Sequence, residues 1–326
     1  MPVDDGGPQT PTPAPSSRLG FDLAALAVLV AGGLGALALW RRGGGSLQVG
    51  GVVAGTLALA AGVVVVPAAF AAEPAPRANV VLSEVVAATS VAEGKTATVT
   101  ASCPAGSVLV GGGLRTTPDA AATTAHVSVS QPTAGGWQVT ATAGSEAPVT
   151  LTAVAECTSN RGVEPVLATG PTVALPSGSS VESVVGCPDG QPLAVGWNTG
   201  TASPVAVLPL QTGGIVSAWA RTDGAALATT TLHCTGGAAT VDVLRSDEGS
   251  LDVVSGGVGE SEATCPAGFS AVGGGYTAAA RYGGRLAAVT PMTAAPEDDG
   301  YVVRVQAEPG GPPLQLSVYA LCLPTA

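Results

Sequence analysis

The residues whose type and spacing indicate the clearest chemistry in this chain of 326 residues are its six cysteines. Three of them open a Cys-Pro-x-Gly motif, and each is followed later by one further cysteine. Six cysteines allow fifteen pairings, but every copy of the pattern owns one early and one late cysteine. The sequence therefore predicts one structural disulfide in each copy, formed in an oxidising compartment. The expected pairs are Cys103 with Cys157, Cys187 with Cys234, and Cys265 with Cys322.

Catalytic and metal-binding patterns are missing from the sequence. It has no Gly-x-Ser-x-Gly elbow, no His-Glu-x-x-His and no Walker-type phosphate loop. A Ser-His-acid set would need His126 or His233, and the alternation of both neighbourhoods predicts surface positions on strands. No two cysteines are close enough to form a redox or zinc motif. We expect no enzyme activity, no cofactor and no bound metal.

Two acidic clusters could hold calcium loosely through carboxylate oxygens. The first runs from Glu297 to Gly300, and the second is Asp247-Glu248-Gly249. Asp-Gly before an alternating strand is typical of a hairpin turn. We interpret both clusters as turns.

Trp197 is the residue that departs most clearly from the repeated pattern. Counted from the opening cysteine, it replaces a glycine of the other copies, Gly113 or Gly275, and Asn198 follows it. An exposed tryptophan beside an amide could stack on a sugar ring, which makes this pair a possible ligand contact. The alternative is that Trp197 fills a space left by Ile215, which takes the place of a larger aromatic residue.

The elements that must position these residues have the period of β-strands. In each copy a glycine lies nine residues after the opening cysteine, and a strand led by a large residue follows later; these glycines are Gly112, Gly196 and Gly274, and the large residues are Trp137, Ile215 and Tyr301. The closing strand alternates apolar and polar residues, with the cysteine on the apolar face. Each copy of about eighty residues has room for five or six strands, and no segment after residue 72 predicts a helix.

This pattern resembles repeats in secreted proteins of actinobacteria and their phages, in which Cys-Pro-x-Gly, a triple glycine, an aromatic-led strand and a final cysteine recur. The resemblance covers residues 97–326, and the second copy departs from it at Val195-Gly196-Trp197 and at Ile215. It implies an exported all-β protein. It implies no activity, because none is assigned to the group.

The N-terminal part predicts export. Residues 1–20 are rich in proline and polar residues and are expected to be disordered. Residues 21–40 could form a transmembrane helix, and residues 41–72 contain either a second one or a signal peptide. In the first case Arg41 and Arg42 are cytoplasmic, as the positive-inside rule requires. In the second case cleavage falls near Ala71. A twin-arginine signal is a weaker alternative.

Three copies are expected at residues 73–164, 165–238 and 239–326, as antiparallel β units that either stand as separate small sandwiches or close around a pseudo-threefold axis. The net charge of −11 and the single lysine argue against nucleic acid as a partner. The leading hypothesis is a non-catalytic envelope or secreted protein that binds or displays at the outer side of the cytoplasmic membrane. Its partner would be an envelope glycan or another surface protein. A carbohydrate-binding module is the alternative, and an extracellular hydrolase is third.

Overall fold

The computed structural model describes residues 80–117, 125–144, 147–160, 163–176, 179–220, 226–236, 244–280 and 287–325. They belong to one compact unit that runs from Ala72 to Ala326. The proline-rich tail, both apolar segments and the cleavage pattern near Ala71 lie outside the described residues, so the expectations for them stay predictions.

All regular elements of the described residues are strands, as the sequence predicted. The first copy contains β1 (Leu82–Val91), β2 (Thr96–Ser102), β3 (Val108–Thr117), β4 (Ala125–Thr133), β5 (Gly136–Ala143) and β6 (Val149–Thr158). The second contains β7 (Pro165–Thr169), β8 (Val173–Leu175), β9 (Ser180–Gly186), β10 (Pro192–Asn198), β11 (Ser203–Leu210), β12 (Gly213–Trp219) and β13 (Ala226–Thr235). The third contains β14 (Leu244–Val253), β15 (Val258–Thr264), β16 (Phe269–Ala280), β17 (Val289–Glu297), β18 (Gly300–Ala307) and β19 (Leu314–Pro324).

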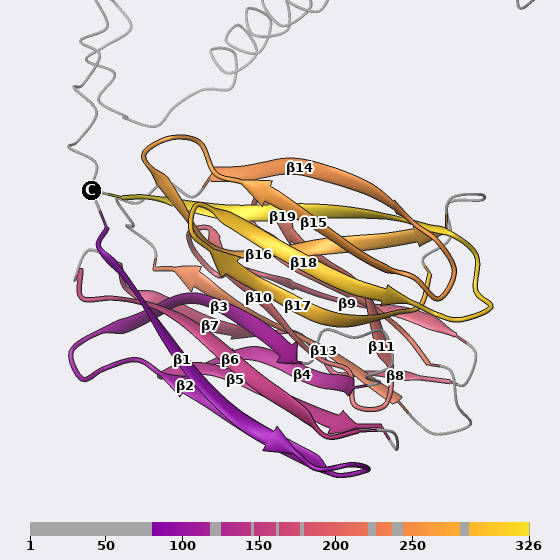
Figure 1. The fold of residues 1–326 in the computed structure, drawn as a ribbon. Coiled ribbons are helices and arrows are strands. Elements are labelled where there is room, and N and C mark those ends of the chain that lie inside the picture. Colours follow the sequence, from indigo (N-terminus) through magenta and orange to yellow (C-terminus); the bar gives the residue numbers. More distant parts are fainter. Residues whose placement is uncertain are drawn as a thin grey trace, which may run out of the picture. The chain divides into compact units, whose positions relative to one another are not determined.

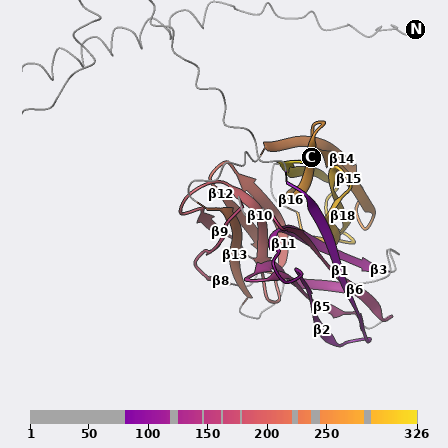
Figure 2. The same cartoon turned by 90° about the vertical axis from the view of Figure 1, so that its left-hand side faces the viewer.

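The strands form three antiparallel sheets, and each sheet contains strands of two copies (Figures 1 and 2). Sheet 1 has the order β1-β6-β3-β17-β18-β15, so the first copy is followed by the third. Sheet 2 has the order β2-β5-β4-β10-β13-β7, with β8 also paired to β13, and joins the first copy to the second. Sheet 3 has the order β14-β19-β16-β11-β12-β9 and joins the third copy to the second. The strand order thus repeats with a threefold pattern, and the copies are not separate sandwiches.

Within each copy, the two groups of three strands pack face to face although they belong to different sheets. In the first copy, β1, β6 and β3 pack on β2, β5 and β4. The apolar faces of these strands form the main core. The closing strand confirms the predicted apolar inner face, because the residues on this face of β6 are all at most 2% exposed: Val149, Leu151, Ala153, Ala155 and Cys157. The outer face alternates only at Thr150 and Thr152, which are half-buried, because Val154, Glu156 and Thr158 are buried as well.

The three disulfides have the expected pairing, Cys103–Cys157, Cys187–Cys234 and Cys265–Cys322. In every copy the first cysteine follows a strand of one sheet and the second lies in a strand of another. The first bridge joins sheets 1 and 2, the second joins sheets 2 and 3, and the third joins sheets 3 and 1. The bridges therefore link the three sheets in a closed ring.

The turn after each opening cysteine explains the glycine of Cys-Pro-x-Gly. Gly106, Gly190 and Gly268 have φ angles of 86°, 81° and 82°, in the left-handed region that favours glycine. Val80 and Thr325 lie at the same ends of the strands, where they form a parallel bridge. The chain thus enters and leaves the described unit at the end that carries the Cys-Pro turns.

A bulge in the strand after each Cys-Pro turn builds a second, central core. The residues without a cross-strand partner are Val110 in β3, Leu193 in β10 and Val272 in β16. All three are 0% exposed and pack in one cluster with Val80, Val163 and Leu323. An extra residue in a strand bends it and leaves its side chain free to leave the ladder. The bulges bring the three copies together at one point.

The junctions between copies are short. The strands β3 and β17 pair through two residue pairs, Leu114 with Ala294 and Arg115 with Thr293. The strands β10 with β4 and β16 with β11 also share two pairs each. A proline follows in the same place of all three partner strands, and a proline cannot donate a ladder hydrogen bond. These prolines are Pro296, Pro132 and Pro209.

Candidate binding surface

Trp197 is 1% exposed and lies opposite Ser130 of the first copy at a junction. Its ring therefore offers no surface on which a sugar could stack, and this part of the sequence hypothesis does not fit the structure. Asn198 is half-buried, and its Oδ1 accepts a hydrogen bond from the backbone N–H of Gly200 at 3.3 Å. The side chain of Asn198 thus closes a local turn.

The cross-strand register also corrects the alignment of the second copy. In each copy, the last cross-strand pair before the bulge contains the closing cysteine. Its partner in this pair is Leu109 in the first copy, Pro192 in the second and Ala271 in the third. The second copy therefore has one residue fewer between its opening cysteine and its bulge. Trp197 corresponds to Leu114 and Tyr276, which are also buried, and not to a glycine.

The same register explains how the copies exchange large and small residues. A Cβ on Gly112 would lie 2.8 Å from the Trp137 ring, and one on Gly274 would lie 2.5 Å from the Tyr301 ring. In the second copy the residue in the place of Trp137 is Gly214, not Ile215, and a Cβ there would lie 3.1 Å from the side chain of Val195. In the second copy the glycine, Gly214, thus lies on the strand that carries the large residue in the other copies, and the larger residue, Val195, lies on the strand that carries their glycine.

The two histidines lie on sheet 2 but in different environments. His126 is half-buried, and its Nε2 lies 2.9 Å from the carbonyl oxygen of Gly200. His233 is 5% exposed, so the predicted surface position is wrong. Burial lowers the pKa of His233 to about 4, which keeps the ring neutral at physiological pH.

The burial of His233 has a tertiary cause that strand parity cannot reveal. His233 corresponds to Glu156 and Leu321, each beside a closing cysteine and in register with the residue after the bulge. In sheet 1 that residue is Gly111, and a Cβ on it would collide with the backbone of Val272 from the third copy. The outer face is thus covered next to the bulges, where the copies meet.

The acidic clusters differ from each other. Asp298 and Asp299 form the turn between β17 and β18, as predicted, and Asp298 has a φ of 49°. Asp247, Glu248 and Gly249 do not form a turn, because they lie inside β14, where the register shifts between Glu248 and Ser250. Within the described residues, no group of three or more His, Cys, Asp and Glu side chains is arranged to hold a metal ion.

One row of side chains on the outer face of sheet 3 is apolar, and we call it the sheet 3 row. Val184, Ile215 and Leu208 are cross-strand partners on β9, β12 and β11, and Tyr319 lies beyond Gly275 on β19. Val184 is 50% exposed, and the other three are half-buried. The corresponding residues of sheet 2 are polar: Thr100, Gln138, Gln131 and Thr231. The fold alone therefore does not require an apolar row here.

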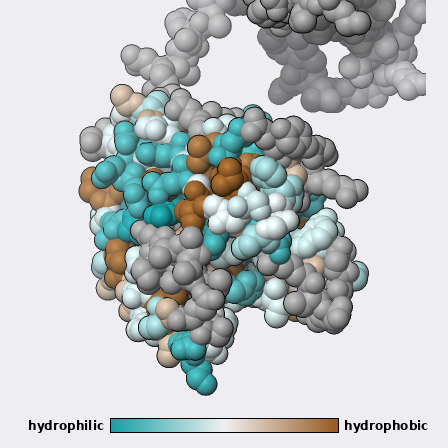
Figure 3. Space-filling view, turned by 45° about the vertical axis from the view of Figure 1, so that its right-hand side comes forward, coloured by the Kyte–Doolittle hydropathy of each residue, from teal (hydrophilic) through white to brown (hydrophobic). Residues whose placement is uncertain are grey.

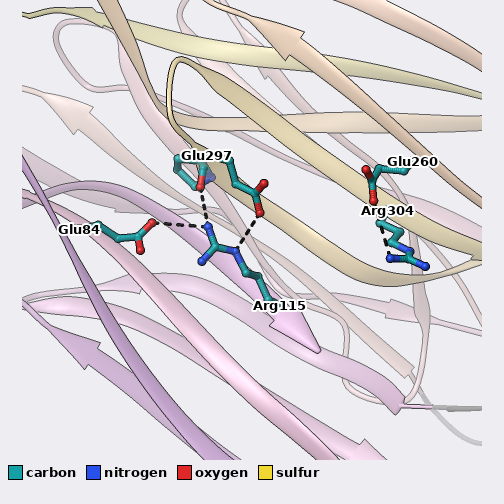
Figure 4. Close-up of polar contacts among 6 residues, drawn as sticks. Glu84, Arg115, Glu260, Glu297 and Arg304 are labelled. Atoms are coloured by element: carbon teal, nitrogen blue, oxygen red, sulfur yellow. Dashed lines mark hydrogen bonds and ion pairs between the residues drawn. The ribbon is translucent and has the colours of Figure 1, made fainter. Parts of the chain in front are cut away.

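Sheet 1 carries ion pairs on its outer face (Figure 4). Arg115 reaches Glu84 at 3.5 Å and Glu297 at 3.1 Å, and its Nη2 donates to the carbonyl oxygen of Pro296 at 3.0 Å. Arg304 lies 3.8 Å from Glu260. On the face drawn in Figure 3, small groups of apolar residues are surrounded by hydrophilic ones. The three sheets thus present different chemistry on one shared architecture.

The sequence matches no protein family model and no curated protein. None of the described residues belongs to a helix of the length and hydrophobicity that crossing a bilayer requires.

Proposed function

We propose that this protein is an exported, non-catalytic envelope or secreted protein that binds another surface protein. The observation that carries the proposal is the ring of three disulfides, which suits an oxidising compartment outside the cytoplasm. The low aromatic content limits what burial alone can contribute to stability, and covalent links between sheets compensate for this.

The sheet 3 row supports binding rather than a purely structural role. Adjacent apolar side chains on an outer sheet face mark interaction sites in soluble proteins more often than scattered ones do. Three of the four side chains of the row are aliphatic, which favours a protein surface as the partner, because sugars are bound through exposed aromatic rings and polar groups. Trp137, Trp197, Tyr276 and Tyr301 are buried, so the aromatic side chains of the described residues that remain for a carbohydrate-binding role are the half-buried Trp219, Phe269 and Tyr319.

Export can be tested on intact cells that express the full chain with a C-terminal tag. We expect added protease to remove the tag and a thiol reagent to find no reactive cysteine. A protected tag together with reduced cysteines would place the protein in the cytoplasm and overturn the proposal.

Binding can be tested by chemical cross-linking at the cell surface, with the single variants Ile215→Ser and Gln138→Ser. These two residues occupy corresponding positions of sheets 3 and 2. We expect Ile215→Ser to reduce cross-linked protein partners severalfold and Gln138→Ser to leave them unchanged. Equal losses would contradict a role of the sheet 3 row, and binding on a glycan array instead would favour the carbohydrate alternative.

A further inference from the structure

The junction between β3 and β17 differs from the other two junctions by its charge. Arg115 of the first copy pairs with Glu297 of the third at 3.1 Å. In the corresponding places, the β10–β4 junction has Asn198 and Thr133, and the β16–β11 junction has Thr277 and Leu210. One of the three equivalent junctions therefore contains an ion pair, while the other two have uncharged residues in these places and provide internal controls.

Glu156 places another carboxylate next to this ion pair. It lies on β6 in direct register with Glu84 on one side and Gly111 on the other. Glu156 is only 7% exposed, because the third copy covers the sheet at Gly111. The charged groups that face Glu156 are Glu84 from β1 and Arg115 from β3, and Glu297 of β17 shares the guanidinium of Arg115.

These neighbours disfavour the ionised form of Glu156. Burial raises its pKa, the carboxylate of Glu84 raises it further, and Arg115 lowers it, with a result of about 7. Glu156 thus changes its charge near neutral pH, whereas an ordinary glutamate is ionised well below it.

We propose that Glu156 makes the contact between the first and third copies sensitive to pH, by competing with Glu297 for Arg115 when it loses its proton. With Glu156 neutral, Arg115 forms ion pairs with Glu84 and Glu297 and so links β3 to β17. With Glu156 ionised, a third carboxylate in register with Glu84 attracts the guanidinium of Arg115 toward the first copy, and the link of Arg115 to Glu297 on the third copy weakens. Only two residue pairs hold the strands together there, so the junction opens more readily.

The direction of the pH dependence follows from the thermodynamic linkage between protonation and folding. Glu156 has a higher pKa in the folded protein than in the unfolded chain, so its proton stabilises the fold at low pH. This stabilisation is complete below about pH 4.5 and is lost as the pH rises through about 7. The junction is therefore tightest in mildly acidic surroundings.

Hydrogen exchange of the full, oxidised chain at pH 6 and pH 8.5 tests this proposal, with rates corrected for the intrinsic effect of pH. We expect the protection of the backbone amides of β3 and β17 at the junction to fall on the order of tenfold at pH 8.5. The junction amides of β10, β4, β16 and β11 should change little. In Glu156→Gln, which has nearly the same shape, the difference between the two pH values should disappear.

Two further variants separate the pH effect from a general loss of stability. Glu93→Gln removes an exposed carboxylate of the same copy from the turn between β1 and β2, and should keep the wild-type response. Glu297→Gln removes the partner of Arg115 and should lower protection at both pH values. An equal change at all three junctions, or an unchanged response in Glu156→Gln, would overturn the proposal.

Discussion

At the scale of single residues, corresponding positions of the copies have acquired different protonation behaviour. Glu156, His233 and Leu321 occupy the same buried place beside a closing cysteine, but they are acidic, basic and apolar. The pKa of the acid is raised and that of the histidine is lowered, so burial favours the neutral form of both. Their effects on stability therefore have opposite dependence on pH.

The burial of His233 is expected to lower the free energy of unfolding in acid. Its pKa is about 4 in the folded protein and about 6.5 in the unfolded chain, so only the unfolded chain takes up a proton between these values. The contribution of His233 to the free energy of unfolding should fall as the pH drops through this range, by about 2 kcal/mol between pH 8 and pH 5, while Glu156 acts in the opposite direction. His233→Leu, which copies Leu321, should remove this contribution. Urea unfolding of wild type and variant at both pH values measures it as the difference between their changes, and an equal change in the two proteins would contradict the assignment.

At the scale of elements, a glycine lies opposite a large side chain in each copy. A Cβ on Gly112 would lie 2.3 Å from the carbonyl oxygen of Val154 and 2.8 Å from the Trp137 ring. Neither the ladder of sheet 1 nor the buried indole can move away freely, so Gly112→Ala should destabilise the protein by about 1–3 kcal/mol. Gly135→Ala is the matched control, because nothing lies within 4 Å of its added Cβ. Urea midpoints compare the two, and equal shifts would argue against close packing at Gly112.

The sequence predicted the presence of the strands but not which strands pair between different copies. The cysteine pairs and the apolar face of β6 follow from spacing and from a period of two, which are local signals. The pairing of Leu114 with Ala294 joins residues 180 positions apart, and nothing in either strand identifies the other. The same long-range contacts bury His233 and Glu156. The missing residue before the bulge of the second copy shifts Trp197 by one position, which becomes visible only in the register.

At the scale of the whole molecule, shared sheets predict that the three copies unfold together. Every sheet needs strands from two copies, so the loss of one copy leaves two sheets incomplete. The disulfides close sequence separations of 54, 47 and 57 residues that do not overlap, so each restricts a different part of the unfolded chain. Removing one bridge with Cys103→Ala and Cys157→Ala should cost about 4 kcal/mol or less. That cost should lower the midpoint of one common transition.

Calorimetry and circular dichroism of the double variant measure this cooperativity. A single transition at lower temperature, with the calorimetric enthalpy equal to the van't Hoff enthalpy, is the expected result. The variant Cys187→Ala with Cys234→Ala should shift the same transition by a similar amount, because its loop is of similar length. An early step confined to the altered copy, followed by the remaining two at the original temperature, would mean that the copies are independent. The strand order argues against that outcome, because each copy supplies about half of the strands of two of the three sheets.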